Sequence, residues 1–385
     1  MCFAKITLNL RLILSFIILL VLIGACFYLG DLFVSSGKNL LEAVSHQPLK
    51  EAYYYQKLDK QSVQCQLCPR QCIIAPGKRG FCRVRENIEG ILYSLVYAQP
   101  CAVHIDPIEK KPLFHFLPSS SAFSVATAGC NFKCAYCQNW QISQARPEEV
   151  DSVYLPAQEL VKKALESGCL TIAYTYSEPV IFYEYMLESA KLAKASGIRN
   201  VMHSNGFINE QPLRELCKYL DAANIDLKGF SQKHYREIAL GDLEAVLRTL
   251  KILKQEGVWV EITNLILPGF NDGEEEISKM CLWIRENLGE EVPVHFSRFW
   301  PMYKLLSLSP MPISTLQKAR KIALDCGLKY VYLGNVTPGH SAENTFCPNC
   351  GNVVIKRNRY TILEVNLDAE GGCKLCGEKI EGIWK

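Results

Sequence analysis

From residue 123 onward, short apolar runs alternate with longer segments in which apolar residues recur every three or four positions. The short runs, rich in β-branched and aromatic residues, predict strands, and the longer period predicts amphipathic helices. The expected strands are residues 123–127, 171–175, 200–203, 222–227, 259–265, 294–299 and 330–333. The expected helices are residues 157–167, 180–196, 212–220, 243–255, 274–288 and 314–326.

This alternation predicts parallel βα units, because a helix is the usual connection between neighbouring parallel strands. Six or seven such units curl into an open or closed barrel, so we predict an α/β fold, a partial TIM barrel of the (β/α)6 type. Reactive groups in such a fold lie on the loops after the carboxyl ends of the strands.

The most apolar segment of the chain is residues 12–30, which carry no charge and follow Lys5 and Arg11. This length is sufficient for a membrane-spanning helix. Residues 23–26 also resemble a lipoprotein processing site, so a cleaved signal segment is the alternative. We expect an uncleaved membrane anchor with the catalytic domain in the cytoplasm, although Lys5 and Arg11 favour the opposite orientation.

The composition is that of a folded globular chain of 385 residues, with 49% apolar and 21% charged residues. The net charge is +3 and no basic run stands out, so no nucleic-acid partner is expected. We predict four parts: an anchor or signal segment (1–34), a linker with a cysteine-rich metal-binding lobe (35–118), the barrel (119–340) and a zinc-ribbon-like domain (341–385).

Eleven of the eighteen cysteines fall into three groups. The N-terminal cysteines are Cys65, Cys68, Cys72 and Cys82; the middle cysteines are Cys130, Cys134 and Cys137; the C-terminal cysteines are Cys347, Cys350, Cys373 and Cys376. Cysteines two residues apart are poor disulfide partners but suit a shared metal ion. We therefore predict a metalloprotein with more than one kind of site, and treat the scattered cysteines as buried apolar residues.

The C-terminal cysteines form two similar pairs joined by a strand-like stretch, the pattern of a zinc ribbon that folds a short tail. The N-terminal cysteines are less regular, and four thiolates suit either zinc or a second iron–sulfur cluster.

The middle cysteines directly follow the first expected barrel strand. Three thiolates can hold three irons of a 4Fe–4S cluster and leave the fourth iron open to another ligand. A three-thiolate zinc site or a purely structural cluster is the alternative, but neither explains the aromatic Tyr136 and the position at a strand end together.

The segment from Cys130 to Cys137, with Tyr136 before its last cysteine, resembles the signature of the radical S-adenosylmethionine (SAM) superfamily. The resemblance implies that the open iron binds the amino and carboxylate groups of SAM. One electron from the reduced cluster then cleaves the sulfonium to a 5'-deoxyadenosyl radical. The resemblance also implies that the middle cysteines are the catalytic cluster ligands and that Tyr136 is a cofactor-binding residue.

Further motifs resemble this superfamily at successive strand ends. Glu178 stands where the family commonly has Gly-Gly-Glu-Pro contacting the SAM amino group, although Ser177 departs from that pattern. Asn205 resembles the Ser/Thr-Asn-Gly turn of glycyl-radical activating enzymes, which implies a place near SAM. Asp226 and Lys228 resemble their Asp-Leu-Lys motif, which implies contacts with the ribose hydroxyls and the carboxylate.

A narrower resemblance covers most of the chain after residue 64. Residues 65–72, 105–111, 134–140, 295–299 and 330–335 resemble the radical SAM member of the AmmeMemoRadiSam system, related to pyruvate formate-lyase activating enzymes. It implies a low-potential electron donor of the flavodoxin or ferredoxin type, and as partners a Memo-like and an AMMECR-type protein or a glycyl-radical enzyme. Such activases place extra clusters after the SAM motif, which favours zinc at the N-terminal cysteines.

We therefore expect a radical SAM oxidoreductase that abstracts hydrogen from a protein or small molecule. A glycyl-radical activase is the first alternative, and a membrane-attached iron–sulfur and zinc electron carrier is the alternative of another class. His104 and His115 suit an acid or base role, but structural roles are favoured. Residues 106–111 equally suit a solvated charge run.

Overall fold

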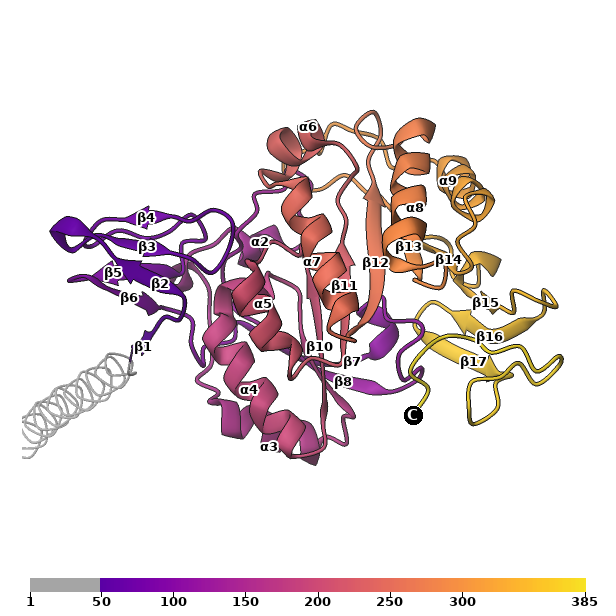
Figure 1. Cartoon of the computed structure of the whole chain (residues 1–385), viewed down its shortest axis with the longest axis horizontal. Coiled ribbons are helices and arrows are strands. Elements are labelled where there is room, and N and C mark those ends of the chain that lie inside the picture. Colours follow the sequence, from indigo (N-terminus) through magenta and orange to yellow (C-terminus); the bar gives the residue numbers. More distant parts are fainter. Residues whose placement is uncertain (1–48) are drawn as a thin grey trace, which may run out of the picture. The chain divides into compact units, whose positions relative to one another are not determined.

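The largest element of the fold is an eight-stranded sheet (Figure 1). The structure is a computed structural model that describes residues 49–385. Seven neighbouring strands are parallel, as predicted, because a helix returns the chain after most of them. In chain order these strands are β8 (Ser121–Ala126), β9 (Thr171–Tyr174), β10 (Arg199–Ser204), β11 (Ala222–Asp226), β12 (Trp259–Ile266), β13 (Val294–Arg298) and β14 (Val331–Gly334). The predicted α/β fold is confirmed.

Six helices connect these strands close to the expected positions. They are α3 (Ala157–Glu166), α4 (Tyr183–Ala195), α5 (Glu210–Cys217), α7 (Leu243–Gln255), α8 (Glu274–Leu288) and α9 (Ile313–Asp325). Each buries one apolar stripe; α7, for example, buries Val246, Leu250 and Leu253 and is capped by Asp242, whose carboxylate accepts from the amide of Ala245. Shorter helical segments are α2 (Trp140–Ser143), α6 (Gln232–His234), the π-turn η5 (Tyr235–Ala239) and the 3-10 turn η4 (Pro179–Phe182).

The eighth strand, β7 (Ala102–Pro107), pairs antiparallel with β8 at the edge of the sheet. It lies within the stretch expected to be an irregular cysteine-rich lobe. An edge strand pairs through its backbone and leaves much of its side-chain surface in solvent, so it needs no regular apolar pattern. The short 3-10 turn η2 (Ile108–Lys110) follows it directly.

The cysteine-rich lobe consists of two small antiparallel sheets. One contains β1 (Lys50–Glu51), β5 (Arg85–Ile88) and β6 (Ile91–Ser94); the other contains β2 (Tyr55–Lys57), β3 (Val63–Cys65) and β4 (Ile73–Ile74), with the turn η1 (Asp59–Gln61) between β2 and β3. A fully buried ion pair between Arg85 and Glu184 ties this lobe to α4. Tyr53 adds a backbone hydrogen bond to the same carboxylate, at 2.7 Å.

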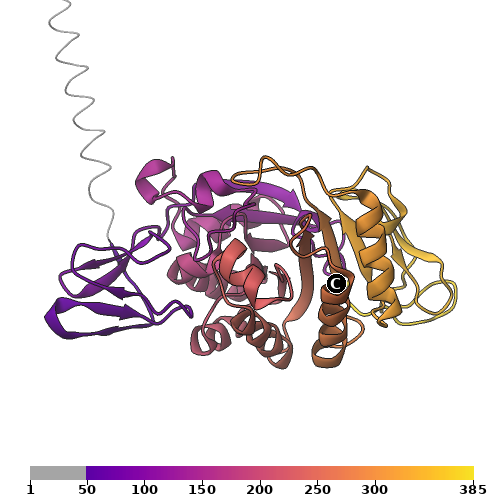
Figure 2. The same cartoon turned by 90° about the horizontal axis from the view of Figure 1, so that it is seen from above.

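The C-terminal segment forms a third small sheet of β15 (Thr345–Phe346), β16 (Val353–Asn358) and β17 (Thr361–Val365), after the turn η6 (Ser341–Glu343). Its core includes Val354, Ile355 and Ile380 and continues into Tyr330 and Tyr332 beside β14. Figure 2 shows this segment in yellow at the opposite end of the parallel sheet from the indigo N-terminal lobe.

The predicted membrane anchor requires a correction. Within residues 49–385 no helix combines the length and the apolar composition that crossing a bilayer requires. The apolar run at residues 12–30, on which the prediction depended, lies outside the described residues. The membrane-spanning helix and the membrane-anchored localisation that the sequence predicts are therefore wrong for the described residues.

Candidate active site

The loop between β8 and α2 carries the middle cysteines and begins with a glycine that its surroundings require. Gly129 has φ +96°, a left-handed conformation that side chains rarely adopt. A Cβ atom there would lie 2.6 Å from Cγ1 of Val84 and 2.8 Å from the carbonyl oxygen of Cys82. The loop can therefore pack directly against the N-terminal lobe only because residue 129 has no side chain.

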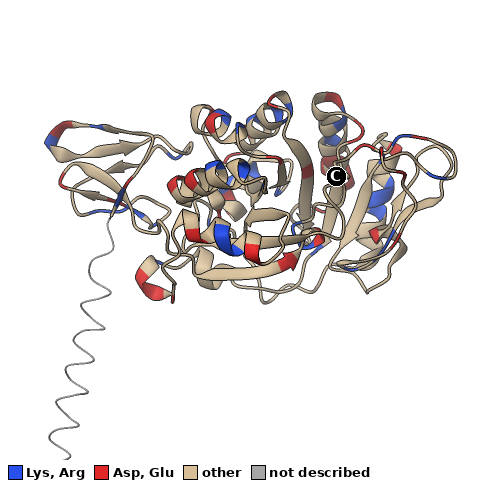
Figure 3. Cartoon of the chain, turned by 90° about the horizontal axis from the view of Figure 1, so that it is seen from below, with Lys and Arg blue, Asp and Glu red and all other residues tan. Residues whose placement is uncertain are grey.

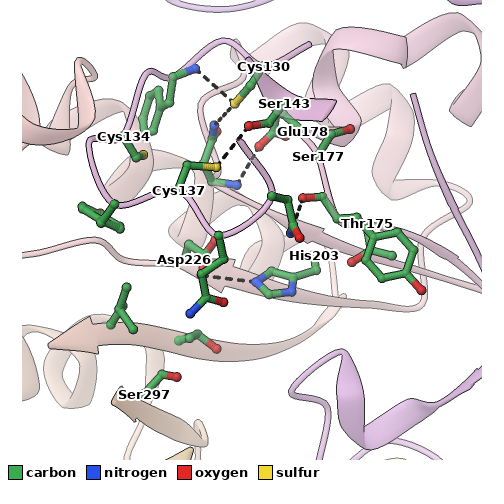
Figure 4. A pocket seen from close by; sticks show the side chains of 18 of the residues that line it. Cys130, Cys134, Cys137, Ser143, Thr175, Ser177, Glu178, His203, Asp226 and Ser297 are labelled. Atoms are coloured by element: carbon green, nitrogen blue, oxygen red, sulfur yellow. Dashed lines mark hydrogen bonds and ion pairs between the residues drawn. The ribbon is translucent and has the colours of Figure 1, made fainter. Parts of the chain in front are cut away.

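The three middle cysteines line one cavity of about 440 Å3. Figure 4 shows the three cysteines beside Glu178, with His203 and Asp226 below them; Glu178 follows β9, and His203 and Asp226 lie at the ends of β10 and β11. The amide of Phe132 donates to Sγ of Cys130 at 3.3 Å, and Oγ of Ser143 lies 3.0 Å from Sγ of Cys137. These contacts hold the sulfurs of Cys130 and Cys137 in place at the cavity.

Burial raises the pKa of the Cys134 thiol to about 12, and it raises the pKa of Cys130 as well. A buried thiolate is unfavourable without a compensating cation, so bound metal would stabilise all three sulfurs and displace their protons. The hydroxyl of Tyr136 is buried in the loop without a hydrogen-bond partner. Tyr136 lines the cavity together with the three cysteines.

Glu178 and Asn205 hold one another in place across two strand ends. Oε1 of Glu178 accepts from the Ser204 hydroxyl at 2.7 Å and from the Val180 amide at 3.1 Å, and Oε2 accepts from the Asn205 amide at 2.9 Å. Burial raises the pKa of Glu178, although these hydrogen bonds oppose the shift. The Asn205 side chain donates to Oδ1 of Asn131 at 2.8 Å, next to the first middle cysteine.

Asp226 lies between two basic side chains at the end of β11. Nε2 of His203 lies 3.2 Å from Oδ1, and Nζ of Lys228 lies 2.6 Å from Oδ2. Burial alone would raise the pKa of Asp226, but the Lys228 charge and His203 outweigh burial and hold it below its usual range. The site therefore keeps a carboxylate ionised inside a buried cavity, where it can accept hydrogen bonds from hydroxyl groups.

Comparison with known proteins agrees with this geometry. Residues 124–281 match the profile described as the Radical SAM superfamily. The chain is 48% identical over 334 residues to an uncharacterized protein of Methanocaldococcus jannaschii, covering 86% of this chain and 99% of that one. The chain belongs to the radical SAM superfamily.

Two further likenesses are more distant. A pyruvate formate-lyase-activating enzyme of Clostridium pasteurianum is 26% identical over 163 residues, covering 40% of this chain and 65% of the enzyme. Among solved structures, Streptococcus suis SuiB bound to S-adenosylmethionine is 14% identical, with a TM-score of 0.45 over 63% of this chain and 56% of that one. The SuiB likeness is too remote to support a conclusion.

The predicted enzyme class is thus confirmed: the protein is a radical SAM enzyme. This class uses a 4Fe–4S cluster and SAM and depends on a reductant. The three thiols, the buried carboxylates and the size of the cavity fit both groups. The electron-carrier alternative loses its basis, because the superfamily is defined by SAM chemistry.

Sequence reasoning missed a polar network at the rim of the radical SAM cavity. Asp106 of β7 accepts from Lys110 at 2.8 Å, from Lys111 at 2.6 Å and from the Tyr176 hydroxyl. Lys110 and Tyr176 line the cavity. Burial lowers the pKa of Lys111 to about 8, although Asp106 opposes the shift. The interpretation of this stretch as a solvated charge run is therefore wrong for Asp106 and Lys111, which are buried.

His203 was also missed as a site residue, although its position just before Ser204 and Asn205 at a strand end could have identified it. His115 has a structural environment, as favoured from the sequence. Its Nε2 lies 2.5 Å from the Tyr332 hydroxyl, and Nδ1 lies 2.6 Å from the carbonyl oxygen of Glu381. His104 is exposed on β7, with its ring packed edge-on to Tyr176.

The two four-cysteine groups do not line this cavity. The C-terminal cysteines bring their four sulfurs within 4.8 Å of one another, with Cys347 and Cys376 3.6 Å apart and Cys350 and Cys373 3.8 Å apart. The N-terminal cysteines line a second, smaller cavity.

Proposed function

We propose that this enzyme binds a 4Fe–4S cluster through Cys130, Cys134 and Cys137 and cleaves SAM reductively beside it. The observation that carries the proposal is one cavity lined by all three thiols together with Glu178, Asn205, Asp226 and Lys228. When bound, the cluster and SAM supply a 5'-deoxyadenosyl radical that removes a hydrogen atom from a protein or small-molecule substrate.

The polar residues of the cavity have distinct proposed roles toward SAM. Asp226 accepts from the ribose hydroxyls, and Lys228 balances its charge and faces the SAM carboxylate. Glu178 lies at the SAM amino group. The backbone amide of Asn205, at the next strand end, holds the Glu178 carboxylate in place. Tyr136, which lines the same cavity, would contact the bound cofactor.

The substrate side of the cavity is built from three separate parts of the chain. Lys110 follows β7, Asn335 follows β14, and Tyr360 lies in the turn between β16 and β17. The C-terminal sheet therefore contributes a wall to the cavity, which gives the segment a role in shaping substrate access. Lys110 and Tyr360 add a cationic and an aromatic side chain to the lining, which favours a substrate with a polar group.

Anaerobic reconstitution with iron and sulfide, followed by dithionite and SAM, tests the reaction. We expect 5'-deoxyadenosine from the native protein and none from Cys134→Ala, because a cluster with only two protein ligands at this loop is unstable. Cys281→Ala, on α8 and outside the cavity, is the matched control and should keep the product. Cleavage that persists in Cys134→Ala would exclude this cluster assignment.

Activation of a glycyl-radical enzyme is the second candidate, favoured by the likeness to the Clostridium pasteurianum activating enzyme. Incubation of the reduced enzyme and SAM with a candidate glycyl-radical protein should then give a glycyl-radical EPR doublet.

A Memo-like and an AMMECR-type protein are the proposed partners if the chain belongs to the AmmeMemoRadiSam group, and a flavodoxin or ferredoxin is the proposed electron donor. Co-purification of the tagged enzyme with each candidate tests these partners.

We propose zinc for the C-terminal cysteines, residues of the domain predicted at 341–385. Tetrahedral zinc with bonds of about 2.3 Å places its sulfurs about 3.8 Å apart, close to the two separations given above. Cys376→Ser should lower the zinc content by one equivalent per chain and leave the iron content unchanged. Loss of iron with the zinc unchanged would contradict the assignment.

A further inference from the structure

The N-terminal cysteines converge on one cavity from different parts of their lobe. Cys65 ends β3, Cys68 and Cys72 lie in the turn before β4, and Cys82 lies just before β5. All four line the cavity, whose remaining walls are largely apolar and include Leu67, Ile74, Val180 and Ile181. Four thiols that converge on one largely apolar cavity have the ligand set of a metal site.

The spacing of these sulfurs differs from that of the C-terminal cysteines. In residues 49–385, the C-terminal set is the one group of three or more potential ligand side chains whose ligand atoms all lie within 4.8 Å of one another. A single zinc ion requires such convergence, since its four sulfurs are about 3.8 Å apart. The N-terminal cysteines surround a shared space without meeting this condition, and so do the middle cysteines. An iron–sulfur cluster produces this wider arrangement, because its cysteines bind different irons of one inorganic core.

A hydrogen bond and two basic residues lie near the sulfurs of the N-terminal cavity. Nη1 of Arg85 donates to Sγ of Cys65 at 3.4 Å. Arg70 and Arg85 are both among the residues that line the cavity. These features stabilise a buried anionic group, and hydrogen bonds to sulfur also tune the potential of an iron–sulfur cluster.

The N-terminal cavity adjoins the loop that holds the middle cysteines. Asn131 lines the cavity of the N-terminal cysteines, whereas the preceding Cys130 lines the cavity of the middle cysteines. Nε of Arg70 donates to the carbonyl oxygen of Asn131 at 2.6 Å. On the other side of Cys130, Gly129 packs against the Cys82 carbonyl, as described above. The two cysteine groups are therefore separated by little more than one stretch of backbone.

We propose that Cys65, Cys68, Cys72 and Cys82 bind a second iron–sulfur cluster, in place of the zinc ion that the sequence favoured. The cluster lies against the radical SAM loop, and its ligands come entirely from the N-terminal lobe. It is a further metal centre beyond the cluster of the proposed function, and it does not depend on SAM cleavage.

The decisive sample is the full chain with Cys130→Ala, Cys134→Ala and Cys137→Ala combined, reconstituted without oxygen. We expect this triple variant to retain iron, acid-labile sulfide and a reducible cluster signal by EPR, with one equivalent of zinc per chain from the C-terminal site. Adding Cys68→Ser should remove the iron, whereas adding Cys281→Ala should not. Because the triple variant lacks the cluster of the proposed function, its outcome is independent of that function.

Two results would overturn the proposal: a triple variant with two equivalents of zinc and no iron, or one with no metal beyond the C-terminal zinc. If the triple variant fails to fold, Mössbauer spectra of the native protein decide the question. Two cluster populations support a second cluster. One cluster together with two equivalents of zinc contradicts it.

Discussion

At the scale of single residues, the cavity is built from polar groups that fix each other before any cofactor binds. Glu178 receives hydrogen bonds from Ser204 and Asn205 on the next strand end, and Asp226 is placed between His203 and Lys228. Such mutual support keeps side chains near the geometry they need for catalysis, which lowers the cost of organising them when substrate arrives.

Replacing the half-buried carboxylate of Asp226 should affect cofactor use more than folding. In Asp226→Asn, Lys228 and His203 lose their counter-charge and the ribose hydroxyls lose an ionised acceptor. We expect 5'-deoxyadenosine formation to slow by at least about tenfold, equal to about 1.4 kcal/mol in the barrier. Product is measured in timed assays at equal iron content. Asp151→Asn, at an exposed position, is the control, and equal rates for the two variants would contradict the role of Asp226.

The glycine before the cluster loop should resist substitution. Gly129→Ala combines a left-handed φ with overlap against Val84 and the Cys82 carbonyl, so we expect unfolding free energy to fall by about 1–3 kcal/mol or more. Gly168→Ala is the matched control, because Gly168 has φ +66° but nothing within 4 Å of the added Cβ. Denaturant unfolding measures both, and a Gly129→Ala cost no greater than that of Gly168→Ala would show that the close packing is unimportant.

At the scale of elements, hydrophobic periodicity was sufficient to predict the parallel strands and the main helices, because each element buries a continuous apolar face. It was insufficient for β7, whose pairing with β8 depends on backbone hydrogen bonds at a sheet edge. The Asp106 network was missed for the same reason, since Tyr176 and Lys111 are distant in the sequence and meet only through that pairing.

Substitutions in the ion pair between Arg85 of β5 and Glu184 of α4 test what attaches the N-terminal lobe to α4. Glu184→Gln leaves Arg85 buried without a counter-charge, so we expect a loss of about 3–5 kcal/mol in unfolding free energy. Glu148→Gln, in the exposed pair with Arg79, should cost at most about 1 kcal/mol. Chemical denaturation compares the two. The double variant Arg85→Met/Glu184→Leu should recover most of the loss; failure to recover would show that the pair acts through shape and not through charge.

At the scale of the whole described chain, the parallel sheet with its helices contacts both the N-terminal lobe and the C-terminal sheet. The N-terminal lobe contacts α4 and the cluster loop, and the C-terminal sheet adds Tyr360 to the cavity wall. Figure 3 shows basic and acidic segments interspersed along the helices, where pairs such as Lys279 with Glu275 are exposed and contribute little to stability. The modules are therefore joined mainly by buried contacts.

The junction between barrel and C-terminal sheet should make stability depend on pH. Burial lowers the pKa of His115 to about 4, below the ordinary 6.5, and His234 shifts in the same direction. The unfolded chain then binds more protons between about pH 4 and 6.5, so unfolding free energy falls as pH decreases through this window. His115→Gln should flatten part of the slope in urea unfolding at a series of pH values, while exposed His104→Gln should not. An unchanged slope in His115→Gln would contradict a buried neutral imidazole.

The sequence by itself determined the βα order, the cysteine groupings and the radical SAM motif, because periodicity and short-range spacing are local properties of the chain. Tertiary structure decided what depends on distant segments meeting. It placed the middle cysteines beside Glu178 and Asp226, brought Lys110 and Tyr360 to one rim, and spread the N-terminal sulfurs around a cavity while drawing the C-terminal ones together. Spacing along a chain limits which side chains can share a metal, but the distance between their sulfurs depends on the packing of the whole lobe.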